Sequence, residues 1–282
     1  MRSEYYNRSV RPTYRETRRR FFDHPAVRIE GAAARAGRSI RTPEALTPEL
    51  QIVLTLRGAF VYERGASHSL LTANQALFIA PGDVSRDRFV DDNPLDYMLV
   101  TPRLDAVGSL VGEQASAEMR KMRDTRVAGA SATLQRAASA LWNLHRRSSH
   151  DGAAAEESAI SLLSLLFSSP APRGRAGRGH SLLIGAAKEL IGAGRERRSL
   201  TDIAAQLQVS PAYLTDLFRR HEGVSIARYQ RRLRLSRALV ELPHTADIAA
   251  LALDLGFSSH AHFSTAFRAT YGESPSRYRE RF

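Results

Sequence analysis

The chain has no cysteine in its 282 residues. This absence excludes a disulfide framework and thiol-based redox sensing, and it is typical of an intracellular protein. No apolar run is long enough to cross a bilayer, and the N-terminus lacks the apolar stretch of a signal peptide. We therefore expect a cytoplasmic protein with no membrane partner.

Basic residues are in excess, with 41 Lys and Arg against 29 Asp and Glu and a formal net charge of +12. An excess of this sign favours polyanionic partners. Part of the excess lies at the start of the chain. Residues 1–22 hold seven arginines against two glutamates, and we predict a disordered basic arm there.

A duplication near the C-terminus is the most informative feature of the sequence. Three pairs of residues share one offset of 49, namely Phe218 and Phe267, Gly223 and Gly272, and Tyr229 and Tyr278. Each copy predicts a short helix, a tight turn and a second helix, at about 200–221 and 248–271. An ordinary helical hairpin would explain one copy, but two copies at one offset favour paired helix-turn-helix motifs that bind DNA.

In the first motif, Ser210 suits an N-cap and Pro211 suits the first position of the second helix. Leu214, Leu217 and Phe218 recur at the spacing of a buried helical face. The opposite face carries the predicted DNA contacts, which are Ala212, Tyr213, Thr215, Asp216, Arg219 and Arg220. Such a helix fits the major groove, where polar side chains reach base edges.

The second motif repeats this arrangement with one extra residue in the turn. Phe263, Ala266 and Phe267 form the predicted buried face. The predicted DNA contacts are His260, Ser264, Thr265 and Arg268. His260 and His262 resemble a metal-ligand pair, but residues two apart on a helix point in different directions, so we expect no metal site.

Between the motifs, Ser225 to Leu242 predicts one helix of about 27 Å. A strut of this length would set two reading helices about one duplex turn apart. We predict that Arg231 and Arg232 on this helix contact phosphates, although a solvated charged face is the ordinary alternative.

Residues 180–282 resemble the DNA-binding domain of the AraC/XylS family of bacterial transcription regulators. The residues that carry the resemblance are Ser210-Pro-Ala-Tyr-Leu, Leu217-Phe218, Gly223, Leu255-Gly-Phe-Ser-Ser259, Phe263, Phe267, Tyr271-Gly272, Ser274-Pro275 and Tyr278-Arg279. The resemblance implies seven helices in two subdomains joined by the central helix. It implies double-stranded DNA and RNA polymerase as partners, and no cofactor. Thr265 departs from it, because members often place an arginine there.

Residues 25–102 alternate as short strands between turns, which predicts a sandwich or barrel. The predicted strands are Val27–Ala33, Gln51–Leu56, Ala59–Glu63, His68–Leu71, Ala76–Ile79, Arg86–Val90 and Tyr97–Thr101. Residues 76–83 resemble part of the cupin-like sensor barrel that many AraC/XylS regulators carry. We therefore expect an α+β multidomain protein, with a cupin-like effector-sensing and dimerisation domain at 23–168 and an all-α double helix-turn-helix domain at 180–282.

Two leucine-rich helices are predicted between the barrel and a Pro- and Gly-rich linker at 169–179. The first is marked by Leu134 to Leu144 and the second by Ile160 to Phe167. Their leucines suit packing within their own domain or against a partner chain. We favour a homodimer, because many family members dimerise through helices in this position.

The resemblance places an effector pocket in the barrel interior. Strand alternation allows Tyr62, His68, Arg86 and Arg88 to point inward, and two arginines would suit an acidic small molecule, although all four also suit the surface. A metal-dependent cupin enzyme needs several histidines, whereas this region offers His68 alone, with His24 just outside it. We therefore predict no enzyme activity and no metal. We predict a ligand-responsive activator, and the alternative is an effector-independent architectural DNA-binding protein, which a solidly packed barrel would favour.

Overall fold

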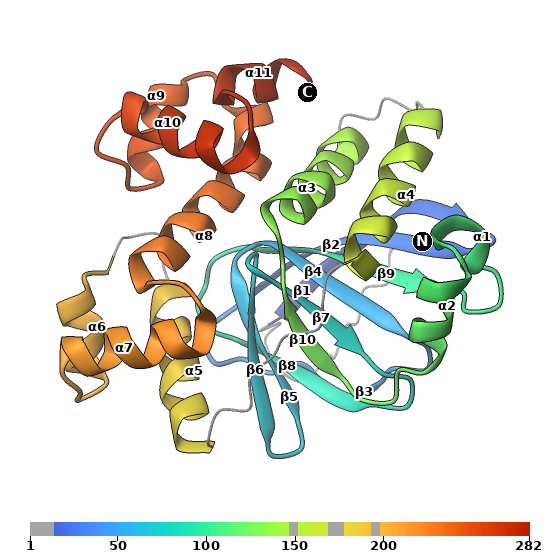
Figure 1. The fold of residues 1–282 in the computed structure, drawn as a ribbon, viewed down its shortest axis with the longest axis horizontal. Coiled ribbons are helices and arrows are strands. Elements are labelled where there is room, and N and C mark those ends of the chain that lie inside the picture. The colour runs from blue at the N-terminus through green and yellow to red at the C-terminus, as the bar shows by residue number, and fades with distance from the viewer. Residues whose placement is uncertain (1–13, 147–151, 169–177, 193–197) are drawn as a thin grey trace.

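The computed structural model describes residues 14–146, 152–168, 178–192 and 198–282, and Figure 1 shows a strand-rich N-terminal domain beside a helical C-terminal domain. This division confirms the predicted α+β multidomain fold class. The C-terminal helices follow two leucine-rich helices that lie next to the sheets (Figure 1).

The strands of the described N-terminal residues form two antiparallel sheets. The larger has the order β1-β2-β9-β4-β7-β10 and the smaller the order β3-β8-β5-β6. Their bounds are β1 Tyr14–His24, β2 Val27–Ala36, β3 Ala45–Leu46, β4 Gln51–Arg57, β5 Ala59–Arg64, β6 Ser67–Thr72, β7 Gln75–Ile79, β8 Val84–Phe89, β9 Leu95–Pro102 and β10 Arg126–Gly129. All seven predicted strands are present within a few residues.

The predicted basic arm at 1–22 is wrong over residues 14–22, whereas residues 1–13 lie outside the described residues. Residues 14–22 belong to β1, which pairs antiparallel with β2 from Tyr14↔Ala36 to His24↔Val27. Phe21 and Phe22 pack against the main core. Strand pairing and these aromatic contacts outweigh the local charge repulsion that favoured disorder.

The larger sheet is a middle layer with two apolar faces. One face packs against the smaller sheet through residues such as Val53, Leu77 and Leu99. The other packs under α3 (Ala132–Arg146) and α4 (Gly152–Ser168). Because β9 is covered on both faces, every one of its residues is buried, and it lacks clean polar alternation.

The leucine faces of α3 and α4 pack within their own domain. Leu134 and Leu141 on α3 and Leu162 and Leu163 on α4 are at most 3% exposed in the single chain. Of the two alternatives for these leucines, packing within their own domain is the one observed, because the outer face of the larger sheet covers them. The homodimer, favoured from the family resemblance, stays a prediction. Two short helices, α1 (Gly108–Val111) and α2 (Glu113–Arg120), precede β10.

Seven α-helices follow in the described C-terminal residues, the number that the family resemblance implied. Their bounds are α5 Arg178–Gly192, α6 Leu200–Gln206, α7 Pro211–Glu222, α8 Ile226–Glu241, α9 Ile248–Asp254, α10 His260–Tyr271 and α11 Pro275–Glu280, with a short 3-10 turn, η1 Leu242–His244. The predicted linker at 169–179 lies outside the described residues except for Arg178 and Gly179, which begin α5.

The central helix α8 is shared by two small cores. Ile226 and Tyr229, near its start, pack with α5, α6 and α7. Leu235 and Leu239, near its end, pack with α9, α10 and α11. Figure 1 shows α8 running from one subdomain to the other. Its 16 residues correspond to about 24 Å of helix.

Both helix-turn-helix motifs are confirmed, and their turns are built alike. Gln208 and Gly256 hold φ values of 56° and 76°, in the left-handed region, at matching points after the first helix. Ser210 and Ser259 then cap α7 and α10, each accepting a backbone N–H bond. A left-handed glycine, Gly223 or Gly272, ends each second helix.

Candidate DNA-reading faces and effector site

The first reading helix, α7, buries the residues that the sequence assigned to its core. Leu214 and Phe218 have no exposed surface. Its predicted reading face is open to solvent, with Thr215 half-buried and the other members exposed: Ala212, Tyr213, Asp216, Arg219 and Arg220.

Contacts along α7 change which charges and hydrogen-bonding groups its polar side chains present to solvent. Asp216 forms an ion pair with Arg220 one turn later, so the negative charge on this face is locally balanced. The hydroxyl of Thr215 donates to the Pro211 carbonyl oxygen at 2.8 Å, which leaves its lone pairs as acceptors. Arg219 is exposed, and we infer that it is the strongest candidate for a base contact.

The second reading helix, α10, exposes His260, Thr265 and Arg268 and half-buries Ser264. Ser264 Oγ lies 3.3 Å from His260 Nε2. His262 instead contacts Ser258 Oγ, with its Nδ1 at 3.0 Å. The two histidines therefore have different neighbours, and no group of three His, Cys, Asp or Glu within the described residues is arranged to hold a metal.

The two arginines predicted to contact phosphates differ in their surroundings. Arg231 is exposed. The Arg232 guanidinium donates to the Ala130 carbonyl oxygen at 2.7 Å, just before α3. Arg232 therefore joins α8 to the N-terminal domain. Its predicted contact with a DNA phosphate would require this bond to Ala130 to break, and it stays a prediction.

The four predicted effector residues do not share a face of the smaller sheet. Tyr62 is inside, in the core between the sheets. His68 and Arg86 are cross-strand neighbours of Glu63, which follows Tyr62 and so points to the opposite face. His68 is exposed. The prediction that all four side chains point inward together was wrong. Side chains alternate between the two faces of a strand, so the strand register, and not the composition, decides which face each one occupies.

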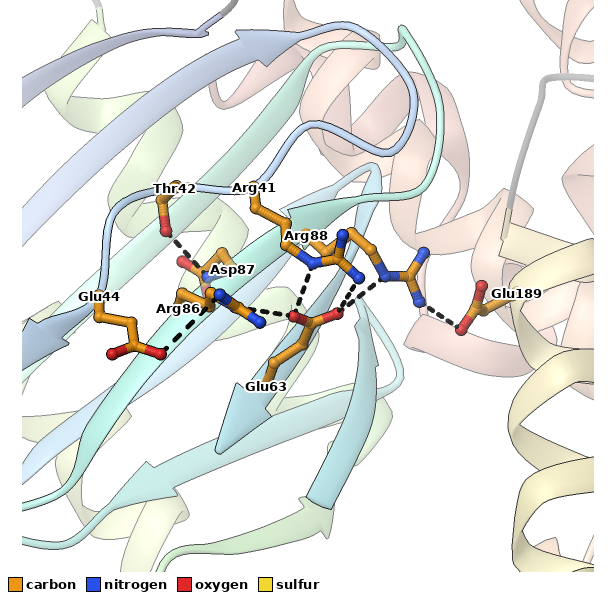
Figure 2. Close-up of polar contacts among 8 residues, drawn as sticks. All are labelled: Arg41, Thr42, Glu44, Glu63, Arg86, Asp87, Arg88 and Glu189. Carbon is orange, nitrogen blue, oxygen red and sulfur yellow. Dashed lines mark hydrogen bonds and ion pairs between the residues drawn. The ribbon is translucent and has the colours of Figure 1, made fainter. Parts of the chain in front are cut away.

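Arg86 and Arg88 bind a carboxylate of the chain itself, and Figure 2 shows three guanidiniums around Glu63. Arg86 Nε and Arg88 Nε each lie 3.0 Å from a Glu63 oxygen, and Arg41 Nε lies at 2.9 Å. Burial would raise the pKa of Glu63, but these hydrogen bonds outweigh it and lower the pKa to about 2. An acidic ligand would have to displace Glu63 from these arginines.

Arg88 also reaches the C-terminal domain. Its Nη2 donates to Glu189 Oε1 on α5 at 2.9 Å (Figure 2). The neighbouring Lys188 binds Glu222 at 3.1 Å, at the end of the reading helix α7. Arg88, one of the four residues predicted to bind an effector, therefore connects the smaller sheet with the subdomain of α5, α6 and α7.

Side chains of the unpredicted strand β1 enter the space between the sheets. The Tyr14 ring packs on Phe89 with centroids 5.5 Å apart. Glu16 accepts a 2.7 Å bond from the Tyr97 hydroxyl. Asp87 faces the same interior, and burial, followed by the nearby charge of Glu16, raises its pKa to about 7. Tyr14, Glu16 and Asp87 therefore enter the space in which the pocket is predicted, and the sequence assigned none of them to it.

A cavity of about 100 Å³ lies between the domains. The ends of β4 and β6 contribute Arg57 and Thr72, and the turn before β9 contributes Asn93. On the other side, α8 contributes Gln230 and Arg237. Sequence reasoning did not find this space, because its two walls lie more than 100 residues apart.

Hydrogen bonds beside this cavity tie both subdomains to the N-terminal domain. Tyr229 Oη lies 3.1 Å from Thr72 Oγ1, and Asn74 Nδ2 donates to the Tyr229 carbonyl oxygen at 3.3 Å. On the other side, Asn143 Nδ2 on α3 donates to Leu239 O at 2.8 Å and to Tyr278 Oη at 3.3 Å. The equal offset of the two tyrosines was visible in the sequence, but their partners were not.

Comparison with known proteins gives two family models that together span the described domains. The model described as AraC-like ligand binding domain matches residues 27–167, and one described as a helix-turn-helix domain matches residues 203–281. This chain belongs to the AraC family. No helix within the described residues is long and apolar enough to cross a membrane.

Curated relatives match the helix-turn-helix region of this AraC-family chain. The regulatory protein PocR of Salmonella typhimurium is 35% identical over 82 residues, which are 29% of this chain and 27% of PocR. The Msm operon regulatory protein of Streptococcus mutans is 39% identical over 83 residues, 29% of this chain and 30% of that protein. The matches thus span less than a third of these relatives.

The comparison with solved structures gives matches to part of the chain and to most of it. A transcriptional regulator from Chromobacterium violaceum with an AraC-type DNA-binding domain is 32% identical, covering 37% of this chain and 96% of that one, with a TM-score of 0.34. ToxT from Vibrio cholerae is 12% identical, covering 90% of this chain and 98% of that one, with a TM-score of 0.36.

Proposed function

We propose that this AraC-family chain is a sequence-specific DNA-binding transcription regulator. The observation that carries the proposal is the exposure of two polar reading faces, on α7 and α10, at the two ends of one helix. Each second helix of a helix-turn-helix fits a major groove. A protein with this task works where DNA is, so we place it in the bacterial cytoplasm, on the nucleoid when bound.

A library selection with the purified full chain tests this proposal. We expect a defined site to be enriched from random DNA. Arg219→Ala should weaken binding to that site by about 1–3 kcal/mol more than binding to random DNA, because a bidentate base contact is lost. Arg231→Ala is the matched control, and it should weaken both about equally and reduce the salt slope by about one. If no site is enriched from the library, the proposed function is contradicted. If Arg219→Ala weakens binding to the selected site and to random DNA equally, the base-reading role of Arg219 is contradicted.

We further propose that a small molecule controls this regulator. The matched ligand-binding model supports this proposal. The effector-independent protein is the alternative, and the β1 side chains in the space between the sheets favour it. The cavity between the domains offers room beside α8. Transcription with purified full chain and RNA polymerase separates the two. Full regulation without any added small molecule would favour the effector-independent protein.

RNA polymerase as a partner, activation rather than repression, and a homodimer also belong to the proposal. The family resemblance supports them, while the leucine faces no longer support the dimer. Sedimentation of the full chain with and without its selected DNA measures the oligomeric state.

A further inference from the structure

Two tyrosines, one repeat apart, occupy equivalent places in the two subdomains. Tyr229 follows the first motif and Tyr278 the second, and they are 3% and 0% exposed. Each ring packs edge-on against the buried phenylalanine of its own reading helix. The centroids are 5.4 Å apart for Phe218 and Tyr229 and 5.8 Å apart for Phe267 and Tyr278. Each tyrosine is therefore fixed to the back of one reading helix.

Both tyrosine hydroxyls contact polar side chains of the N-terminal domain. Tyr229 Oη meets Thr72 Oγ1 at the end of β6, and Tyr278 Oη meets Asn143 Nδ2 on α3. These contacts are buried, where an unmade hydrogen bond is costly. The duplicated sequence thus provides two docking points of the same chemistry.

The N-terminal partners are themselves linked. Gln135 on α3 donates to Ala73 O at 2.6 Å and to Asn74 Oδ1 at 3.0 Å, so α3 is tied to the turn after β6. Gln135 also accepts from Tyr271 Oη at 3.3 Å. We call Thr72, Asn74, Gln135 and Asn143 the docking bracket. Hydrogen bonds join Thr72, Asn74 and Gln135, and Asn143 lies on the same helix as Gln135, so the bracket contacts both subdomains through one part of the N-terminal domain.

Docking leaves the reading faces free. Tyr213 and Arg219 on α7, and Thr265 and Arg268 on α10, are exposed while the tyrosines behind them are docked. The N-terminal domain therefore does not cover the groove-facing side. Its contacts instead affect the positions of α7 and α10.

We propose that the docking bracket sets the distance and orientation between α7 and α10, and so the spacing of the two base blocks that the chain accepts. Its residues are positioning residues for DNA reading, acting through Tyr229 and Tyr278. This inference rests on the proposed DNA-binding function. An effector in the adjacent cavity would then change spacing selectivity by loosening or tightening the bracket.

The test uses the full chain and its selected DNA, alongside DNA with one base pair added between the blocks and DNA with a single block. Tyr229→Phe and Tyr278→Phe each remove one hydroxyl and keep the ring. Each should reduce the preference for the selected spacing by about fivefold, and the double variant by more. Affinity for single-block DNA should stay unchanged.

Tyr97→Phe is the matched control, because its hydroxyl bonds to Glu16 within the N-terminal domain. It should leave the spacing preference unchanged. Thr72→Val removes the same interdomain bond from the other side without touching the reading subdomain, and it should reproduce Tyr229→Phe even if that variant folds poorly.

The outcomes separate the two proposals. If the unaltered chain selects no DNA, the proposed function fails. If it selects DNA but the double variant and Thr72→Val keep the full spacing preference, α8 alone sets the spacing and this inference is wrong. Equal losses on all three DNAs would also overturn it, because the tyrosines would then only support the reading helices.

Discussion

At the scale of single residues, the interior of the N-terminal domain contains a carboxyl group in an unfavourable place. Asp87 lies opposite Tyr62 on the inner face of the smaller sheet. Burial and the negative charges of Glu16 and Glu63 raise its pKa, Arg18 lowers it, and the result is about 7. The folded chain therefore holds a proton on Asp87 at pH values where the unfolded chain has lost it.

This difference predicts how stability depends on pH. A pKa raised on folding contributes stability that is present below the unfolded value, near 4, and is lost as pH rises through about 7. The free energy of unfolding of Asp87→Asn should therefore match that of the unaltered chain near pH 4 and exceed it at pH 8 by about 1–3 kcal/mol. Urea unfolding at both pH values measures this. The same difference at both would show that Asp87 titrates normally when folded.

At the scale of elements, α7 and α10 share the same capping residues and length but present different hydrogen-bond donors on their exposed faces. Arg219 and Arg220 lie on α7, whereas α10 presents Thr265 where family members often have an arginine. Single hydroxyl contacts discriminate bases less than a bidentate guanidinium does. We infer that α7 reads its block more strictly than α10.

Thr265→Arg should therefore raise affinity for DNA, by about 1–3 kcal/mol if the new guanidinium binds guanine or phosphate. Thr17→Arg on β1 is the control, because it adds the same charge at an exposed position outside both motifs. Fluorescence anisotropy across a salt series measures both variants. No gain from Thr265→Arg at any salt concentration, or an equal gain from Thr17→Arg, would mean that position 265 does not face DNA.

Elements with a strong local signal were predictable, and those that depend on distant pairing were not. Ser210, Gly223 and the periodic leucines fix the motifs locally, so both were located from sequence. Arginine-rich β1 forms only because β2 pairs with it, and the inward or outward face of Arg86 depends on register. Glu63 attracts Arg86 and Arg88 from a neighbouring strand, so the predicted effector group could not be resolved from composition.

At the scale of the whole molecule, the two domains share one continuous set of contacts. Arg88 meets Glu189, Tyr229 meets Thr72, and Asn143 meets Tyr278. These bonds connect a predicted sensor with α5, the start of α8 and α11, and so with both subdomains. A change in the N-terminal domain can therefore reach both reading helices at once, which is the property that a regulator needs.

The central claim is that α7 and α10 read one face of the duplex together, and a hydroxyl-radical footprint of the full chain on its selected DNA tests it most directly. We expect two protected patches on the same face, centred about 10 base pairs apart. In Arg219→Ala the protection by α7 should weaken more than the protection by α10. A single protected patch, or two patches on opposite faces of the duplex, would contradict it.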